Sequence, residues 1–116
     1  MPTTETALDR ITTSPTTHAI YATLIQKIDA MGAFDVEPNA TSLHIVRGRA
    51  FLGVHPRKDA LLLNIVLDRP LDGPRVAKCE QVSKNRYHNE VRVASPQDID
   101  RELVTWVKEA YRLTEA

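Results

Sequence analysis

Three of the four histidines in the sequence, His44, His55 and His88, are the side chains best suited to chemistry. An imidazole changes its charge near neutral pH, so a group of them can transfer protons or bind a divalent metal ion. No carboxylate accompanies them at the spacing of a metal site, and the single cysteine, Cys79, cannot build a cysteine-rich one. We therefore predict neither a metal nor another cofactor, and interpret the histidines as candidates for ligand binding.

Basic side chains are concentrated in the same part of the chain. The whole sequence has 15 Lys and Arg against 15 Asp and Glu, and this zero net charge does not favour a nucleic-acid partner. Residues 47–92 nevertheless hold ten basic and five acidic side chains. The favoured explanation is a solvated rim whose charges discourage pairing with other strands. A small anionic ligand is the alternative, because guanidinium groups match phosphate and carboxylate groups. The candidates for anion binding are Arg47, Arg49, Arg57, Lys58 and Arg86.

The sequence gives little support for a catalytic nucleophile. Its four glycines are isolated, so it has no glycine-rich loop for phosphate groups. Cys79 lies in an expected strand, where a cysteine is typical of packing. We assign no catalytic residue, and the sequence favours a non-enzymatic role without deciding the question.

The helices that must position these residues follow from hydrophobic spacing. At 116 residues the chain has room for one domain. Apolar residues at helical spacing after Pro15 predict a helix that ends near Gly32. A second helix is predicted from Ser95, as its cap, to about Leu113.

The N-terminal segment carries no sign of a targeting signal. Residues 1–15 are rich in threonine and are expected to form a flexible arm with one helical turn around Ala7–Ile11, followed by a single domain over residues 16–116. No secretory signal is visible in residues 1–17, and no apolar run is long enough to cross a membrane. A cytoplasmic protein without a membrane partner is the expectation.

Between the two helices the hydrophobic period changes to two, which indicates strands. Gly48-Arg49 is interpreted as a two-residue hairpin loop that pairs Arg47 with Ala50, and residues 56–59 as a turn that pairs His55 with Ala60. Further strands are expected over residues 76–82 and 88–93. This register gives the sheet one aliphatic face and one mixed face. The mixed face contains His44, Val46, Phe51, His55, Leu62, Asn64 and Val66, together with His88 and Arg92 from the last strand.

The three apolar surfaces predict the fold. Both helices have one apolar face, and laying both on the aliphatic face of the sheet buries the most surface. We predict an α+β fold in the order helix, antiparallel sheet of about five strands, helix. The mixed face of the sheet is then left without a helix to cover it.

Several short stretches match a known family. They are Val36-Glu37-Pro38, Leu67-Asp68-Arg69, Ser95-Pro96, Trp106-Val107 and Glu109-Ala110-Tyr111. With them the chain resembles the bacterial family called domain of unknown function 5655, whose members are sometimes labelled predicted transport proteins. Many relatives carry a Cys-x-x-Cys and histidine segment before this domain, which this sequence lacks. The resemblance implies the fold and a bacterial cytoplasmic origin, and it implies no reaction.

The uncovered mixed face supports two hypotheses about function. The preferred one is a non-enzymatic binding or interaction module that contacts a protein partner or a second copy of itself, since monomers rarely expose large apolar patches. The alternative is an enzyme or a small-anion-binding protein that uses His44, His55 and nearby arginines. The residues predicted for binding are His44, Phe51, His55, Leu62, Asn64, His88 and Arg92.

Overall fold

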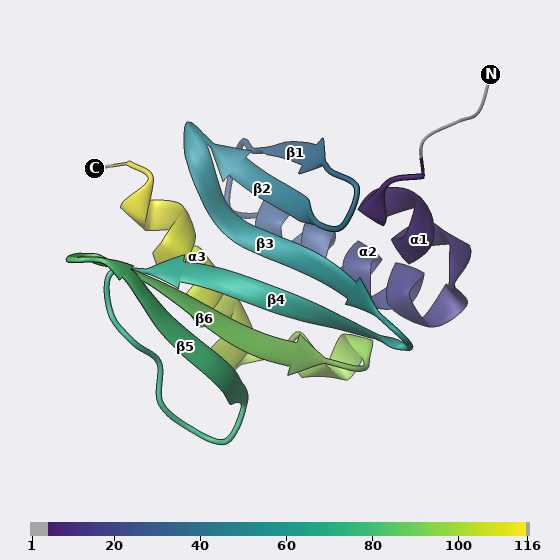
Figure 1. The fold of residues 1–116 in the computed structure, drawn as a ribbon. Coiled ribbons are helices and arrows are strands. Elements are labelled where there is room, and N and C mark those ends of the chain that lie inside the picture. Colours follow the sequence, from purple (N-terminus) through teal and green to yellow (C-terminus); the bar gives the residue numbers. More distant parts are fainter. Residues whose placement is uncertain (1–4, 116) are drawn as a thin grey trace.

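The structure, a computed structural model, describes residues 5–115. Within these residues it contains three α-helices and a six-stranded antiparallel sheet with the strand order β1-β2-β3-β4-β6-β5. The helices lie on one side of the sheet and leave the other side open (Figure 1). The predicted α+β fold is therefore confirmed, with one strand more than expected. The elements are α1 (Ala7–Thr13), α2 (Pro15–Asp29), β1 (Asp35–Pro38), β2 (Leu43–Arg47), β3 (Arg49–Arg57), β4 (Ala60–Leu67), β5 (Val76–Ser83), β6 (Arg86–Val93) and α3 (Arg101–Leu113).

The core lies between the helices and the aliphatic face of the sheet. Ile20 and Leu24 of α2 and Leu103 of α3 are almost completely buried against that face. The sheet contributes the residues that the alternation predicts, among them Ile45 and Leu63. Hydrophobic burial on one sheet face therefore holds the two helices in place.

α3 begins later than the sequence predicts. Residues Pro96–Asp98 form a separate 3₁₀ helix, η1, and the side chain of Asp98 accepts a hydrogen bond from the Ala94 N–H at 2.8 Å. Asp100 caps α3, since its carboxylate accepts from the Leu103 N–H at 3.0 Å. The predicted cap at Ser95 is wrong because its side chain makes no capping hydrogen bond.

α1 extends the single helical turn expected around Ala7–Ile11. Thr6 and Asp9 form a reciprocal capping box at its start. Ala7 and Ile11 are fully buried in the core, and the hydroxyl of Thr17 donates to the Ile11 carbonyl at 2.7 Å. Residues 1–4 of the expected arm lie outside the described residues, and the domain boundary at residue 16 stays a prediction.

A β-bulge in β3 changes the register of the β2–β3 hairpin near its loop. The pairing of Ile45 with Leu52 agrees with the prediction, but Val46 then lies opposite Ala50, which makes Phe51 the extra residue. Because side chains alternate between the faces, this extra residue turns Phe51 into the core, where it is 1% exposed. The prediction that Phe51 lies on the uncovered face is therefore wrong.

The turn between β3 and β4 is tighter than expected. Arg57 pairs with Ala60, which leaves a two-residue turn with Asp59 in the left-handed region at φ 55°. His55 consequently pairs with Leu62 instead of Ala60. The predicted pairing is wrong by two residues, and a shift of two returns every side chain to its predicted face.

β1 is a strand that the hydrophobic pattern does not reveal. It runs antiparallel to β2 at the edge of the sheet, with Val36 opposite Ile45. Most of its residues are exposed, so no alternation of apolar and polar residues marks it. Its pairing with β2 accounts for the sixth strand.

The segment between β4 and β5 is fixed to α3 by two arginines. The guanidinium of Arg69 donates to both carboxylate oxygens of Glu109 at 2.9 and 2.8 Å. Arg75 donates to Asp100 at 2.8 Å and to Glu102 at 3.2 Å. Since Arg75 belongs to the basic excess of residues 47–92, part of that excess is structural.

Candidate functional site

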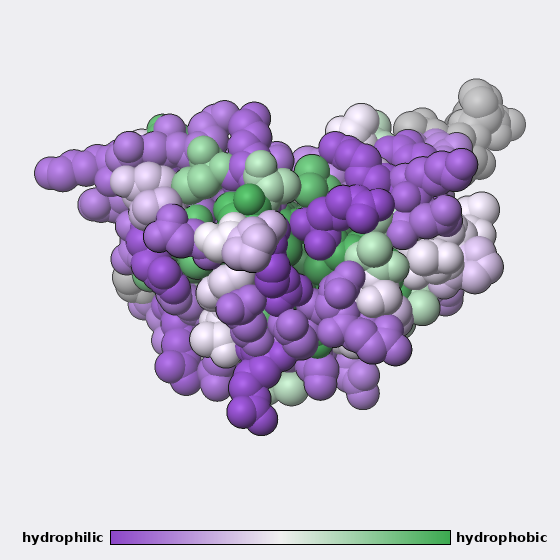
Figure 2. Space-filling model, turned by 90° about the horizontal axis from the view of Figure 1, so that it is seen from below, coloured by the Kyte–Doolittle hydropathy of each residue, from purple (hydrophilic) through white to green (hydrophobic). Residues whose placement is uncertain are grey.

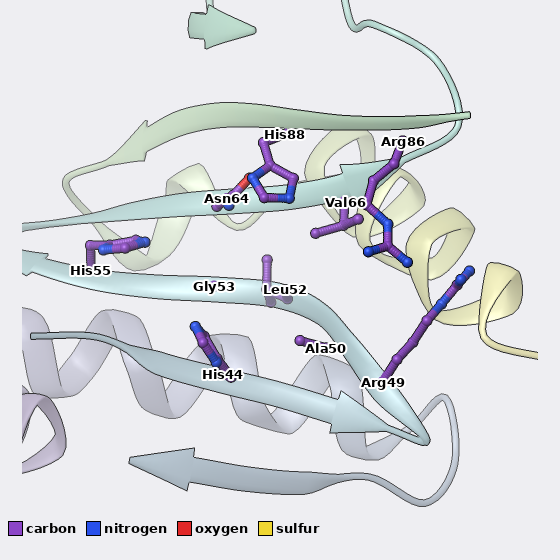
Figure 3. A pocket seen from close by; sticks show the side chains of 10 residues that line it. All are labelled: His44, Arg49, Ala50, Leu52, Gly53, His55, Asn64, Val66, Arg86 and His88. Atoms are coloured by element: carbon purple, nitrogen blue, oxygen red, sulfur yellow. The ribbon is translucent and has the colours of Figure 1, made fainter. Parts of the chain in front are cut away.

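A cavity of about 210 Å³ lies on the open face of the sheet. His44 from β2, His55 from β3 and His88 from β6 line it (Figure 3). The structure thus places the three imidazoles on one face, as the sequence register predicts. Four neighbouring strands, β2, β3, β4 and β6, supply the lining residues, so the site depends on how these central strands pair.

Gly53 leaves the space in the middle of this cavity. The strand register aligns His44, Gly53 and Asn64 in one row across β2, β3 and β4. A Cβ atom at Gly53 would lie 3.3 Å from the Cβ of Asn64 and 3.4 Å from the Nε2 of His55. Any larger residue at this position would therefore fill the cavity between the histidines.

Asn64 lines the cavity with a side-chain oxygen that is not satisfied. Its Oδ1 is buried and has no hydrogen-bond partner among the described residues. A buried acceptor without a partner costs about 1–3 kcal/mol, and most such atoms in folded proteins are paired. A ligand that donates an N–H or O–H to this oxygen would remove the cost.

β3 and β4 separate at one end of the cavity. Their pairing ends at Leu52 and Ile65, although both strands continue beyond these residues. The bulge at Phe51 lies at this point, and a bulge bends the strand that carries it. Ala50 on β3 and Val66 on β4 line the resulting hollow.

Two arginines border this hollow from opposite sides, and the Arg49 side chain runs toward α3 (Figure 3). Arg49 comes from the start of β3, and Arg86 from the start of β6. One nitrogen of Arg49 donates to the Leu113 carbonyl at 2.9 Å, which fixes the direction of its side chain. The same two arginines also line a second cavity of about 290 Å³, together with Asp68 and Ser83.

His55 is held in its neutral form. Burial lowers the pKa of His55 below the ordinary value of 6.5, and the nearby Arg57 guanidinium lowers it further. The neutral form of the imidazole is therefore favoured at pH 7, and this form can accept a hydrogen bond on one nitrogen and donate one from the other. Most of the fixed positive charge at the cavity comes from Arg49 and Arg86.

This lowered pKa predicts a loss of stability on mild acidification. The unfolded chain binds a proton at His55 near pH 6.5, whereas the folded chain binds it only at lower pH, so stability falls as the pH drops below about 6.5. We expect an NMR titration of the His55 Cε1–H to give a midpoint below 6.5, and His55→Gln to reduce the loss of stability between about pH 7 and 5. A midpoint at or above the value of a free histidine would contradict the neutral state of His55.

The residues predicted for anion binding separate into three places. Arg49 and Arg86 lie at the cavity. Arg47 instead forms an ion pair with Glu115 at 2.8 Å, and its guanidinium stacks over an aromatic ring of the core. Arg57 and Lys58 line another cavity at the far end of β3. The five basic residues predicted for anion binding thus do not form one site, and only Arg49 and Arg86 line the cavity of the histidines.

Three other residues predicted for binding do not line the histidine cavity. Leu62 and Arg92 lie opposite each other on β4 and β6, beside it on the same face. Phe51 is in the core. Sequence reasoning missed Asp68 and Ser83 of the second cavity. Nothing in the local pattern brings Asp68 to Arg86, and Ser83, although it pairs with Arg86 in the hairpin, carries no charge that would mark it.

Two searches of the described residues, one for metal-ligating clusters and one for membrane-spanning helices, give negative results. Within residues 5–115, no three His, Cys, Asp or Glu side chains are grouped so that they could hold a metal ion. The helices in this part of the chain are all too short or too polar to cross a membrane.

Comparison with known proteins places the chain in a family. Neither the search of curated proteins nor the search of solved structures finds a match. The model of one family matches residues 8–114, a range that includes every residue lining the histidine cavity and both of its arginines. By this match the chain belongs to the family described as Domain of unknown function (DUF5655), as the resemblance in its sequence predicts.

Proposed function

We propose that this domain binds a small ligand bearing a phosphate or carboxylate group in the cavity on the open face of its sheet. The observation that carries the proposal is the meeting of three imidazoles, two arginines and the unpaired oxygen of Asn64 in one cavity. Arginine side chains supply charge and paired donors for an anion, and Asn64 supplies an acceptor for a hydroxyl or amino group. The ligand therefore has at least one anionic group and one hydrogen-bond donor.

Arg86 is the residue most available to an anion. It is exposed at the start of β6, and no acidic side chain in the described part of the chain forms an ion pair with it. Arg49 is oriented by its bond to the Leu113 carbonyl and keeps its other donors. Because the Arg49 side chain is already held in place, less conformational entropy is lost when the two arginines bind an anion.

A protein partner on this face has less support. The preferred hypothesis from the sequence depends on an apolar patch anchored by Phe51, and Phe51 is buried in the core. Val82 on β5 is the exposed large hydrophobic residue among those described. Figure 2 shows the molecule from below and does not look onto the open face; on the side that it shows, hydrophilic residues dominate and hydrophobic ones gather near the centre. The chemistry of the cavity thus favours a small polar ligand.

Replacing Arg86 tests this proposal. We expect inorganic phosphate to bind the protein with millimolar or tighter affinity in an NMR titration and to shift the imidazole signals of His44, His55 and His88. Arg86→Gln removes one charged donor pair and is expected to weaken phosphate binding by about tenfold. Since Arg86 is exposed, the variant keeps its fold, which the unchanged remainder of the spectrum would verify.

Lys84→Gln is the matched control, because it removes the same charge from the same hairpin at a position that lines neither cavity. It is expected to change the affinity by less than about twofold, as salt screens an exposed charge at a distance. Equal losses in the two variants would mean that phosphate follows the general charge of the hairpin. That result, or no shift of the imidazole signals, would overturn the proposal.

A further inference from the structure

The histidine cavity and the second cavity share one wall. Arg49, Val66 and Arg86 line both, the first of about 210 Å³ and the second of about 290 Å³. The shared wall lies where β3 and β4 separate. The two arginines therefore lie between the two cavities and border both of them.

The remaining lining of each cavity is less favourable to an anion than the arginines are. In the second cavity the carboxylate of Asp68 repels negative charge. In the histidine cavity the burial of His55 favours its neutral imidazole, and Asn64 Oδ1, the buried oxygen without a partner, is an acceptor. An anionic group is therefore best placed at the arginines, with uncharged parts of the ligand on both sides.

We infer that the ligand is a phosphodiester, whose phosphate binds Arg49 and Arg86 while one organic group enters each cavity. This inference rests on the proposed function and adds the position of the anion within the ligand. The group in the histidine cavity donates a hydrogen bond to Asn64. The group in the second cavity meets Asp68, Ser83 and Asn85, which together offer donors and acceptors for hydroxyl or amino groups. Polar groups such as nucleosides or sugars suit both cavities.

The test compares a monoester and a diester that carry the same organic group. Isothermal titration calorimetry with uridine 5′-monophosphate and with uridylyl-(3′→5′)-uridine is expected to show at least tenfold tighter binding of the diester. A monoester carries about two negative charges at pH 7 and a diester about one, so charge alone predicts the opposite order. Tighter binding of the diester would thus require contacts from the second organic group.

Ser83→Phe separates the two cavities. Ser83 is exposed at the end of β5, so a phenyl group there is expected to fill the second cavity without disturbing the core. The variant should lose the advantage of the diester, about tenfold, and keep the affinity for the monoester within about twofold. Lys84→Phe, which adds the same ring beside the cavity, should change neither affinity.

Three results are distinguishable. The phosphodiester inference is overturned if the diester binds no more tightly than the monoester, or if its tighter binding survives Ser83→Phe. If Arg86→Gln still weakens binding of the monoester in that case, the proposed function stands. If neither nucleotide nor inorganic phosphate binds, the proposed function fails and this inference fails with it. Tighter binding of the diester that Ser83→Phe abolishes and Lys84→Phe does not supports both the proposed function and the phosphodiester inference.

Discussion

Phe51→Ala is expected to lower the free energy of unfolding by about 3–5 kcal/mol, as is typical when a large aromatic side chain is removed from a core. Phe51 is 1% exposed, and its ring meets the ring of Tyr111 edge-on at a centroid distance of 5.4 Å. Tyr111 in turn donates a hydrogen bond to the Ala33 carbonyl at 2.9 Å. The substitution therefore leaves a cavity next to a residue that ties α3 to the loop after α2. Urea denaturation followed by circular dichroism would measure the loss.

Val82→Ala is the control for this substitution. Val82 is 42% exposed on β5, so the change is expected to alter stability by less than about 0.5 kcal/mol. A Phe51→Ala protein with unchanged stability but a smaller mass in light scattering would contradict the core position. Such a result would place Phe51 at an interface between copies, on the uncovered face where the sequence register puts it.

Asn89→Ala is expected to lower the free energy of unfolding by about 2–4 kcal/mol, because it leaves several buried backbone groups without a partner. Asn89 is fully buried on β6. Its Oδ1 accepts from the Leu71 N–H at 2.9 Å, and its Nδ2 donates to the carbonyls of Ile65 and Arg69, each at 3.3 Å. These bonds fasten the segment between β4 and β5 to the sheet. Thermal and urea denaturation would measure the loss.

The exposed Asn39 provides the comparison. Asn39→Ala removes the same amide from a solvated position and is expected to change stability by less than about 0.5 kcal/mol. Amide hydrogen exchange adds a local readout, since the Leu71 N–H should lose its protection in Asn89→Ala. Slow exchange of Leu71 in that variant, with normal stability, would show that the segment is held by its arginines alone.

The cavity and the core residue Phe51 have a common origin in the β-bulge. The extra residue turns Phe51 inward, and the same bend lies where β3 leaves β4. The hollow so formed is bordered by Arg49 on one side and by Val66 on the other. One local irregularity thus removes Phe51 from the open face and accompanies the hollow that Arg49 and Arg86 border.

Much of this arrangement could be predicted from the sequence alone. Hydrophobic period is a local property, so the helix after Pro15, the strand alternation around Ile45 and Leu63, and the division of the sheet into two faces are all readable. The placement of His44, His55 and His88 on one face follows from the same alternation. It also survives the two-residue error at the β3–β4 turn, because an even shift keeps every side chain on its face.

Other features were decided by the tertiary structure. The bulge that buries Phe51, the pairing of β1 and the meeting of Arg49 with Arg86 depend on which strands lie side by side and how far their pairing extends. The burial of Asn89 likewise depends on a segment that crosses from β4 to β5. Such long-range contacts leave no period in the sequence, because each is fixed by the packing of elements that are distant along the chain. Local spacing therefore determines which side chains share a face of the sheet. The cavity on the open face and its two arginines depend on where the strands separate, which only the tertiary structure decides.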